Sequence, residues 1–155
     1  MSELGSVYSD GGRAAAGFKG HTGDCSVRAI AIATGRPYKE VYDDLNGRGA
    51  KCKITKRHPR QCRARTGVCV KVLHAYFRDL GWRWTATMGI GTGTTVHLAP
   101  DELPAGRLVA RISKHLCAVI DGTVWDTGNP GPDGLRAVYG YWMPKRARRL
   151  SMLSP

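Results

Sequence analysis

The spacing of the apolar residues changes once along the chain, at Gly81, and this change constrains the fold more than any other feature. Before Gly81, apolar residues recur at helical spacing, which predicts three helices, over residues 25–34, 37–47 and 68–80. After it come short runs rich in β-branched and aromatic residues, separated by Gly, Pro and Asp-Gly. These runs predict strands over residues 82–88, 94–98, 107–113, 115–120, 123–127 and 137–143. The order predicts an α+β fold, with N-terminal helices packed on a mostly antiparallel β-sheet.

Length and composition predict one domain. The chain has 155 residues, of which 42% are hydrophobic, enough for a single core. We expect a flexible N-terminal segment over residues 1–22, the domain over 23–144 with a basic excursion loop at 48–66, and a basic C-terminal tail over 145–155. No run approaches the roughly 20 apolar residues of a membrane span, and no secretory signal is visible. We therefore expect a cytoplasmic protein with no membrane partner.

The chain has five cysteines, an odd number without a signal peptide, which argues against a disulfide framework. Cys52, His58, Cys62 and Cys69 have the spacing C-x5-H-x3-C-x6-C, which lacks the short knuckle typical of zinc sites. We prefer to interpret them as scattered thiols, with Cys69 in the apolar stripe of the third helix. No metal or other cofactor is expected.

Cys25 is the first candidate for chemistry. Asp24 is a residue that can cap a helix, so the thiol of Cys25 is expected in the first helical turn. Unpaired backbone N–H groups and the positive end of the helix dipole favour a thiolate there, and the same groups can hold an oxyanion. The alternative is a buried structural cysteine.

His115 and Asp126 flank a predicted hairpin. Asp121-Gly122 is a dipeptide favoured in two-residue turns, and a turn there would pair Val119 with Val124. His115 and Asp126 would then be diagonal neighbours on one face of the sheet, so the carboxylate could orient the imidazole. Each residue alone also fits an ordinary structural role. Cys117 would lie opposite Asp126 on a strand without a helix dipole, and we interpret it as a wall of the pocket.

This order of residues resembles the papain-like cysteine peptidase superfamily, including its transglutaminase-like and bacteriocin-leader-peptidase-like branches. More closely, four segments resemble a group of uncharacterised phage-encoded proteins with that fold: DCSVRAIAIATGRPYKEVYDDL, LGWRWTATMGIGTG, DELPAGRLVARISKHLCAVIDGTVWDT and AVYGYW.

The resemblance implies a Cys-His-Asp triad, with Cys25 as the nucleophile, His115 as the general base and acid, and Asp126 as the orienting residue. It further implies a thiol hydrolase or acyltransferase acting on a peptide or protein substrate, at a peptide, isopeptide or other amide bond. Papain-like enzymes place a Gln before the nucleophile to complete the oxyanion hole, and no Gln or Asn precedes Cys25 here. His21 or Thr22 could donate a hydrogen bond instead.

The charge of the chain supports a second hypothesis. The net charge is +12, and the stretch from Arg48 to Lys71 contains nine Lys or Arg and no acidic residue. Such runs attract polyanions through counterion release, although they also occur as solvated loops. The alternative function is therefore a catalytically inactive papain-like fold that binds nucleic acid or an acidic host partner. The candidate binding residues are Lys51, Lys53, Lys56, Arg57, Arg60, Arg63 and Arg65.

Overall fold

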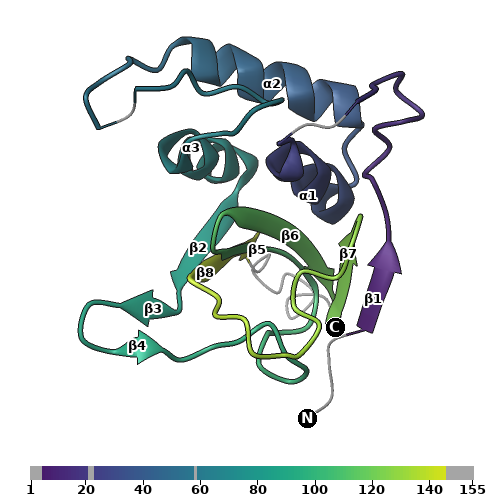
Figure 1. Cartoon of the computed structure of the whole chain (residues 1–155), viewed down its shortest axis with the longest axis vertical. Coiled ribbons are helices and arrows are strands. Elements are labelled where there is room, and N and C mark those ends of the chain that lie inside the picture. The colour runs from purple at the N-terminus through teal and green to yellow at the C-terminus, as the bar shows by residue number, and fades with distance from the viewer. Residues whose placement is uncertain (1–4, 21–22, 58, 146–155) are drawn as a thin grey trace, which may run out of the picture.

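The computed structural model describes residues 5–20, 23–57 and 59–145, which form three helices and a mostly antiparallel six-stranded sheet (Figure 1). The helices are α1 (Cys25–Thr34), α2 (Tyr38–Ala50) and α3 (Val70–Leu80). The strands are β1 (Gly5–Tyr8), β2 (Trp82–Ala86), β3 (Met88–Gly89), β4 (Gly93–Thr94), β5 (Arg107–Ile112), β6 (His115–Ile120), β7 (Thr123–Asp126) and β8 (Gly140–Pro144). The predicted mixed fold, with helices on a mostly antiparallel sheet, is confirmed.

The large sheet has the strand order β1-β7-β6-β5-β8-β2. β1 runs parallel to β7, and every other neighbouring pair is antiparallel. β3 and β4 form a separate small hairpin that projects beside the sheet (Figure 1). β6 is a central strand, and its first residue, His115, is paired with Ile112 of β5.

The core has two parts, one on each face of the sheet. On one face the helices pack against the strands, with α1 lying directly over β6 and α2 on the outer side of α1 and α3 (Figure 1). Val27 and Ile30 of α1 meet Leu116 and Ala118 of β6 in this part. On the other face of the sheet, Leu98 from a loop packs against a second cluster of buried apolar residues, most of which lie on the strands. Burying α1 on the sheet therefore fixes the position of the helix relative to β6, whose first residue is His115.

The N-terminal segment differs from the prediction. Residues 1–22 were expected to be a flexible lead-in, but Gly5–Tyr8 form an edge strand paired with β7. Farther along, Phe18 packs its ring against Tyr38 and Tyr42 of α2, at centroid distances of 4.9 and 4.7 Å. All four residues of β1 are exposed. Because neither face of the strand is buried, its sequence does not alternate between apolar and polar residues, and this alternation is the pattern that predicts a strand.

Several element boundaries also differ. α2 continues through Gly47 and Gly49 to Ala50, which removes the first residues of the predicted loop at 48–66. The strand predicted over residues 94–98 is reduced to β4 and a single bridge between His97 and Ala137. Of the predicted basic tail, only Lys145 lies within the described residues. Within the part of the chain that the structure describes, no helix is long and apolar enough to cross a membrane.

Candidate active site

Cys25 is the first residue of α1, as predicted, and its thiol is partly exposed. Asp24 holds the position before the helix but makes no side-chain cap, which differs from the prediction. Its buried carboxylate instead accepts a hydrogen bond from the Tyr38 hydroxyl at 2.6 Å and pairs with the guanidinium groups of Arg13 (3.2 Å) and Arg28. Hydrogen bonds from guanidinium groups are stronger than a bond from a neutral backbone N–H, because donor and acceptor are both charged. Asp24 therefore anchors the start of α1 to its surroundings.

The hairpin that presents the histidine has the predicted register. Ile120 pairs with Thr123, Val119 with Val124 and Ala118 with Trp125. Asp121 and Gly122 close the turn with φ of 48° and 78°, a left-handed backbone conformation typical of two-residue hairpin turns.

That register brings His115 and Asp126 together. The Nε2 atom of His115 lies 2.6 Å from Oδ2 of Asp126, and the carboxylate is almost fully buried. Its other oxygen accepts the backbone N–H of Thr127 at 2.7 Å. Because Asp126 engages Nε2, the Nδ1 atom is the ring nitrogen left for a second partner.

Cys25 interacts with the same imidazole. Burial alone raises the pKa of the Cys25 thiol, but several interactions outweigh it and hold the pKa below its usual value of 9.0. They are a hydrogen bond from His115, a backbone hydrogen bond from Leu116, and the positive charges of His115 and Arg28. The arrangement therefore favours the thiolate, the nucleophilic form of cysteine.

The imidazole shifts in the complementary direction. Burial lowers the pKa of His115, but hydrogen bonds to Asp126 and Cys25 raise it, with a net result of about 9. For Asp126, burial raises the pKa, yet the bond to His115 and the charges nearby keep it below its usual value. The opposite shifts of the Cys25 and His115 pKa values favour a thiolate beside an imidazolium, with the Asp126 carboxylate ionised behind the ring.

Arg28 is a site residue that sequence reasoning missed. It is one turn along α1 from Cys25, pairs with Asp24, and lies 3.7 Å from Oδ1 of Asp126. Its Nε atom is buried and has no hydrogen-bond partner among the described residues. Arg28 thus links the start of the helix to the acid of the hairpin. The spacing of Cys25 and Arg28 on one helix was visible in the sequence, but their relation to Asp126 depends on how α1 sits on the sheet.

A groove opens beside His115 and Asp126, with a volume of about 530 Å³. Its walls include Ser113, Asn129 and Arg136, from the β5–β6 turn and the segment after β7. Substrate could reach the imidazole from this side. His21 and Thr22, proposed as oxyanion donors, lie outside the described residues.

Cys117, the other sulfur near the site, is 1% exposed and packs in the second apolar cluster. Burial, with the nearby charge of Asp126, raises its pKa far above the usual range. Cys117 is therefore a neutral thiol inside the core, and the described lining of the groove beside His115 does not include it, which differs from its interpretation as a wall of the pocket.

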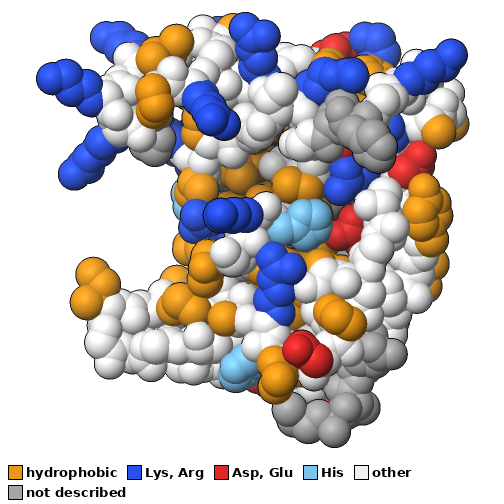
Figure 2. All heavy atoms as spheres, in the orientation of Figure 1, with side chains coloured by type: hydrophobic (Ala, Val, Ile, Leu, Met, Phe, Trp, Pro, Cys, Tyr) orange, Lys and Arg blue, Asp and Glu red, His pale blue; other side chains and the backbone are white. Residues whose placement is uncertain are grey.

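The seven basic residues predicted to bind a partner lie in the segment after α2, and all of them are exposed. In the described ranges none of the seven forms a salt bridge with a carboxylate. Lys and Arg side chains accordingly gather over the helical end of the molecule, around α2 and the loop that follows it (Figure 2).

Comparisons with protein-family models, with curated proteins and with solved structures gave no match to this chain.

Proposed function

We propose that this protein is a thiol hydrolase or acyltransferase of the papain-like type, with Cys25, His115 and Asp126 as its triad. The observation that carries the proposal is a helix-start thiol that interacts with an imidazole whose Nε2 atom is held by a buried carboxylate. This is the arrangement that nucleophilic cysteine catalysis requires: a nucleophile, a base within reach, and a third group that orients the base. The order of the three residues along the chain matches the resemblance to papain-like peptidases.

The proposed reaction has two halves. The Cys25 thiolate attacks the carbonyl carbon of an amide, and a C–S bond forms while the carbonyl oxygen becomes an oxyanion. The His115 imidazolium then gives its proton to the leaving nitrogen as the C–N bond breaks, which leaves a thioester on Cys25. The now neutral imidazole takes a proton from water, or from an acceptor amine, whose attack breaks the C–S bond and restores the thiolate.

The oxyanion would be held by backbone N–H groups at the start of α1, including that of Cys25. The first N–H groups of any helix lack an intrahelical acceptor, and the helix dipole adds positive potential there. One missing oxyanion donor lowers the rate by roughly a hundredfold or more in well-studied hydrolases. We therefore expect activated esters and thioesters to react more readily than plain amides.

The test is acyl transfer from p-nitrophenyl acetate, an activated ester that makes no demand on specificity. We expect an initial burst of one nitrophenolate per chain, with an acetyl group located on Cys25 by peptide mass spectrometry. Cys25→Ala should abolish the burst, and His115→Gln should slow it at least a hundredfold, in the range of lost general-base catalysis.

Lys39→Gln is the control, because it removes an exposed charge from α2, which does not line the groove beside His115. It should keep the burst. A burst that survives Cys25→Ala, or a wild-type rate no higher than that of free glutathione at the same pH, would defeat the proposal.

The exposed basic segment supports a second candidate function: binding of nucleic acid or an acidic host protein by a catalytically inactive fold. Its support is that the seven Lys and Arg side chains are exposed without salt bridges among the described residues. Binding through these side chains should weaken steeply as salt rises, because each neutralised phosphate releases a counterion. A gel-shift titration at several salt concentrations tests this. The candidate fails if binding to DNA, RNA and a polyglutamate chain is absent or independent of salt.

A further inference from the structure

Three of the five cysteines converge at one point on the helical side of the molecule, away from the triad. The Sγ atoms of Cys52, Cys62 and Cys69 all lie within 4.8 Å of one another. Cys52 follows the end of α2, Cys62 lies in the loop, and Cys69 holds the position immediately before α3. The interpretation of these residues as scattered thiols is therefore wrong, and Cys69 is outside the apolar stripe of α3. Spacing along the chain could not show this, because the loop folds back onto α2.

We propose that Cys52, Cys62 and Cys69 form a structural zinc site that joins the basic loop to α2 and α3. Tetrahedral zinc binds thiolates at about 2.3 Å, so two coordinating sulfurs lie roughly 3.8 Å apart. A group of three sulfurs within 4.8 Å needs little adjustment to reach this geometry. The fourth position would be open to water or to another ligand. His58, the remaining member of the sequence pattern, lies outside the described residues and is not part of the argument.

In the structure the sulfurs of Cys62 and Cys69 are joined as a disulfide, and Cys52 is a free thiol. A disulfide uses two sulfurs and gives no role to the third, whereas a metal site uses all three. The two forms are related by a balanced reaction. Two equivalents of a small thiol reduce the disulfide to two thiols and become a disulfide themselves, and Zn²⁺ then displaces three protons from the three thiols.

The surroundings suit the negative charge of a zinc–thiolate site. The backbone N–H of Cys69 donates a hydrogen bond to Sγ of Cys62 at 3.2 Å. Cys69 itself precedes α3, where the helix dipole favours negative charge. Two exposed cations lie close in the chain: Lys51 follows the last residue of α2, and Lys71 is the second residue of α3. Three thiolates with Zn²⁺ carry a net charge of −1, which these cations offset.

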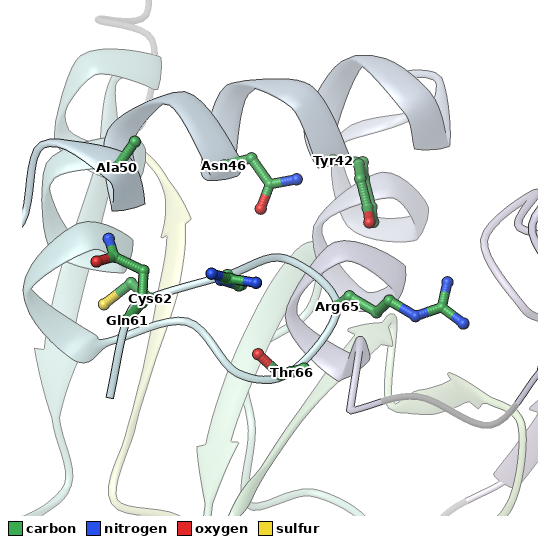
Figure 3. A pocket seen from close by; sticks show the side chains of 8 residues that line it. Tyr42, Asn46, Ala50, Gln61, Cys62, Arg65 and Thr66 are labelled. Atoms are coloured by element: carbon green, nitrogen blue, oxygen red, sulfur yellow. The ribbon is translucent and has the colours of Figure 1, made fainter. Parts of the chain in front are cut away.

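Contacts with α2 hold the loop in the required place. The side-chain amide of Gln61 donates a hydrogen bond to the carbonyl of Gly49, and the backbone N–H of Ala64 donates one to Oδ1 of Asn46 at 2.8 Å. Gly49 also allows a close approach, because a Cβ there would lie 2.2 Å from the carbonyl oxygen of Cys62. Figure 3 shows this arrangement, with Asn46 projecting from α2 toward the loop that carries Gln61 and Cys62. Docking against α2 thus presents Cys62 before any metal binds.

A loop of this kind gains from a metal. Between α2 and α3 the buried hydrophobic residues are Cys62 and Ala64, which bury little apolar surface. Short or polar segments without an apolar core of their own are commonly held by a disulfide or a structural metal. The zinc site would therefore order the segment that carries the exposed basic residues.

The experiment uses the full chain, purified with a thiol reductant and without chelators. We expect one zinc per chain by elemental analysis, and cobalt substitution that gives the absorption bands of a tetrahedral thiolate site. In a thiol titration of reduced protein, added Zn²⁺ should protect three thiols. A site that held only the two sulfurs of the disulfide would protect two.

Cys52→Ser is the decisive variant, because it leaves the disulfide pair intact. It should weaken zinc affinity at least tenfold, whereas Cys25→Ser, which removes a thiol from the triad, should leave affinity and stoichiometry unchanged. The proposal is overturned if reduced wild-type protein shows no protected thiols and no cobalt bands, or if Cys52→Ser binds zinc as tightly as the wild type. The wild-type measurements decide the matter even if a variant fails to fold, and none of them depends on the activity of the triad.

Discussion

Replacing Asp126 with Asn should lower the pKa of His115 without displacing the ring. Asn has nearly the same size as Asp and can still accept the backbone N–H of Thr127. What it loses is the negative charge 2.6 Å from Nε2 of His115. The positive charge of Arg28, 3.7 Å from Asp126, would remain near the imidazole and act in the same direction.

The size of the effect follows from the strength of that bond. A hydrogen bond to a charged, largely buried partner contributes about 1.5–3 kcal/mol, and each pKa unit corresponds to 1.36 kcal/mol. Removing the charge should therefore lower the pKa of His115 by about one to two units from its value of about 9. With fewer imidazolium ions at neutral pH, the thiolate of Cys25 should also become less populated.

The measurement is an NMR titration of the histidine ring signals. The chain has five histidines, and the signal that disappears in His115→Gln identifies the ring in question. Asp43→Asn is the matched control, because Asp43 is an exposed residue of α2 paired with Lys39. The control should leave the pKa of His115 at the wild-type value. If the pKa of His115 in Asp126→Asn also equals the wild-type value, the carboxylate does not stabilise the imidazolium, and the proposed triad is wrong.

Three further outcomes are expected. Gly49→Ala should lower the free energy of unfolding by about 1–3 kcal/mol, because its Cβ would collide with the carbonyl oxygen of Cys62. Gly47→Ala, in the same helix but facing open space, should raise the free energy of unfolding by up to about 1 kcal/mol in the same denaturant titration. If the two substitutions changed this free energy alike, the packing of Gly49 against Cys62 would be contradicted. Cys117 should resist alkylation in the folded protein and react after denaturation, since it is buried with a raised pKa; labelling at the rate of an exposed thiol would contradict this. The lowered pKa of Asp126 stabilises the fold above its ordinary pKa of 3.8, and this stabilisation is lost as pH falls through the folded value. Asp126→Asn should thus be about 1–3 kcal/mol less stable than wild type near neutral pH. In thermal melts this difference should shrink on acidification. A difference that does not change with pH would refute the role of the Asp126 charge in stabilising the fold.

The parts of the fold that local chemistry determines were predictable. Asp121-Gly122 specifies its own turn, and strand alternation then places His115 near Asp126 without knowledge of the rest of the molecule. The start of α1 at Cys25 was likewise visible, because an apolar helical pattern begins there. That Cys25 meets His115 rested on the resemblance, since it depends on where the helix lies on the sheet.

The remaining features depend on contacts between distant segments. β1 is an exposed edge strand, so no apolar pattern marks it. Asp24 was expected to cap its helix, but it binds Arg13 and Tyr38, whose positions a local pattern cannot supply. The convergence of Cys52 with the two other loop sulfurs required the loop to fold back, which the spacing of the cysteines did not indicate.

The central claim is that the imidazolium of His115 stabilises the thiolate of Cys25 and lowers the pKa of its thiol. It is tested most directly by the ultraviolet absorbance of thiolate, recorded as the difference between reduced wild-type protein and Cys25→Ala across a pH titration. We predict that one thiolate per chain is present at neutral pH, disappears on acidification, and is lost at neutral pH in His115→Gln. A difference signal that emerges only as the pH approaches 9.0, the ordinary pKa of cysteine, would contradict the account.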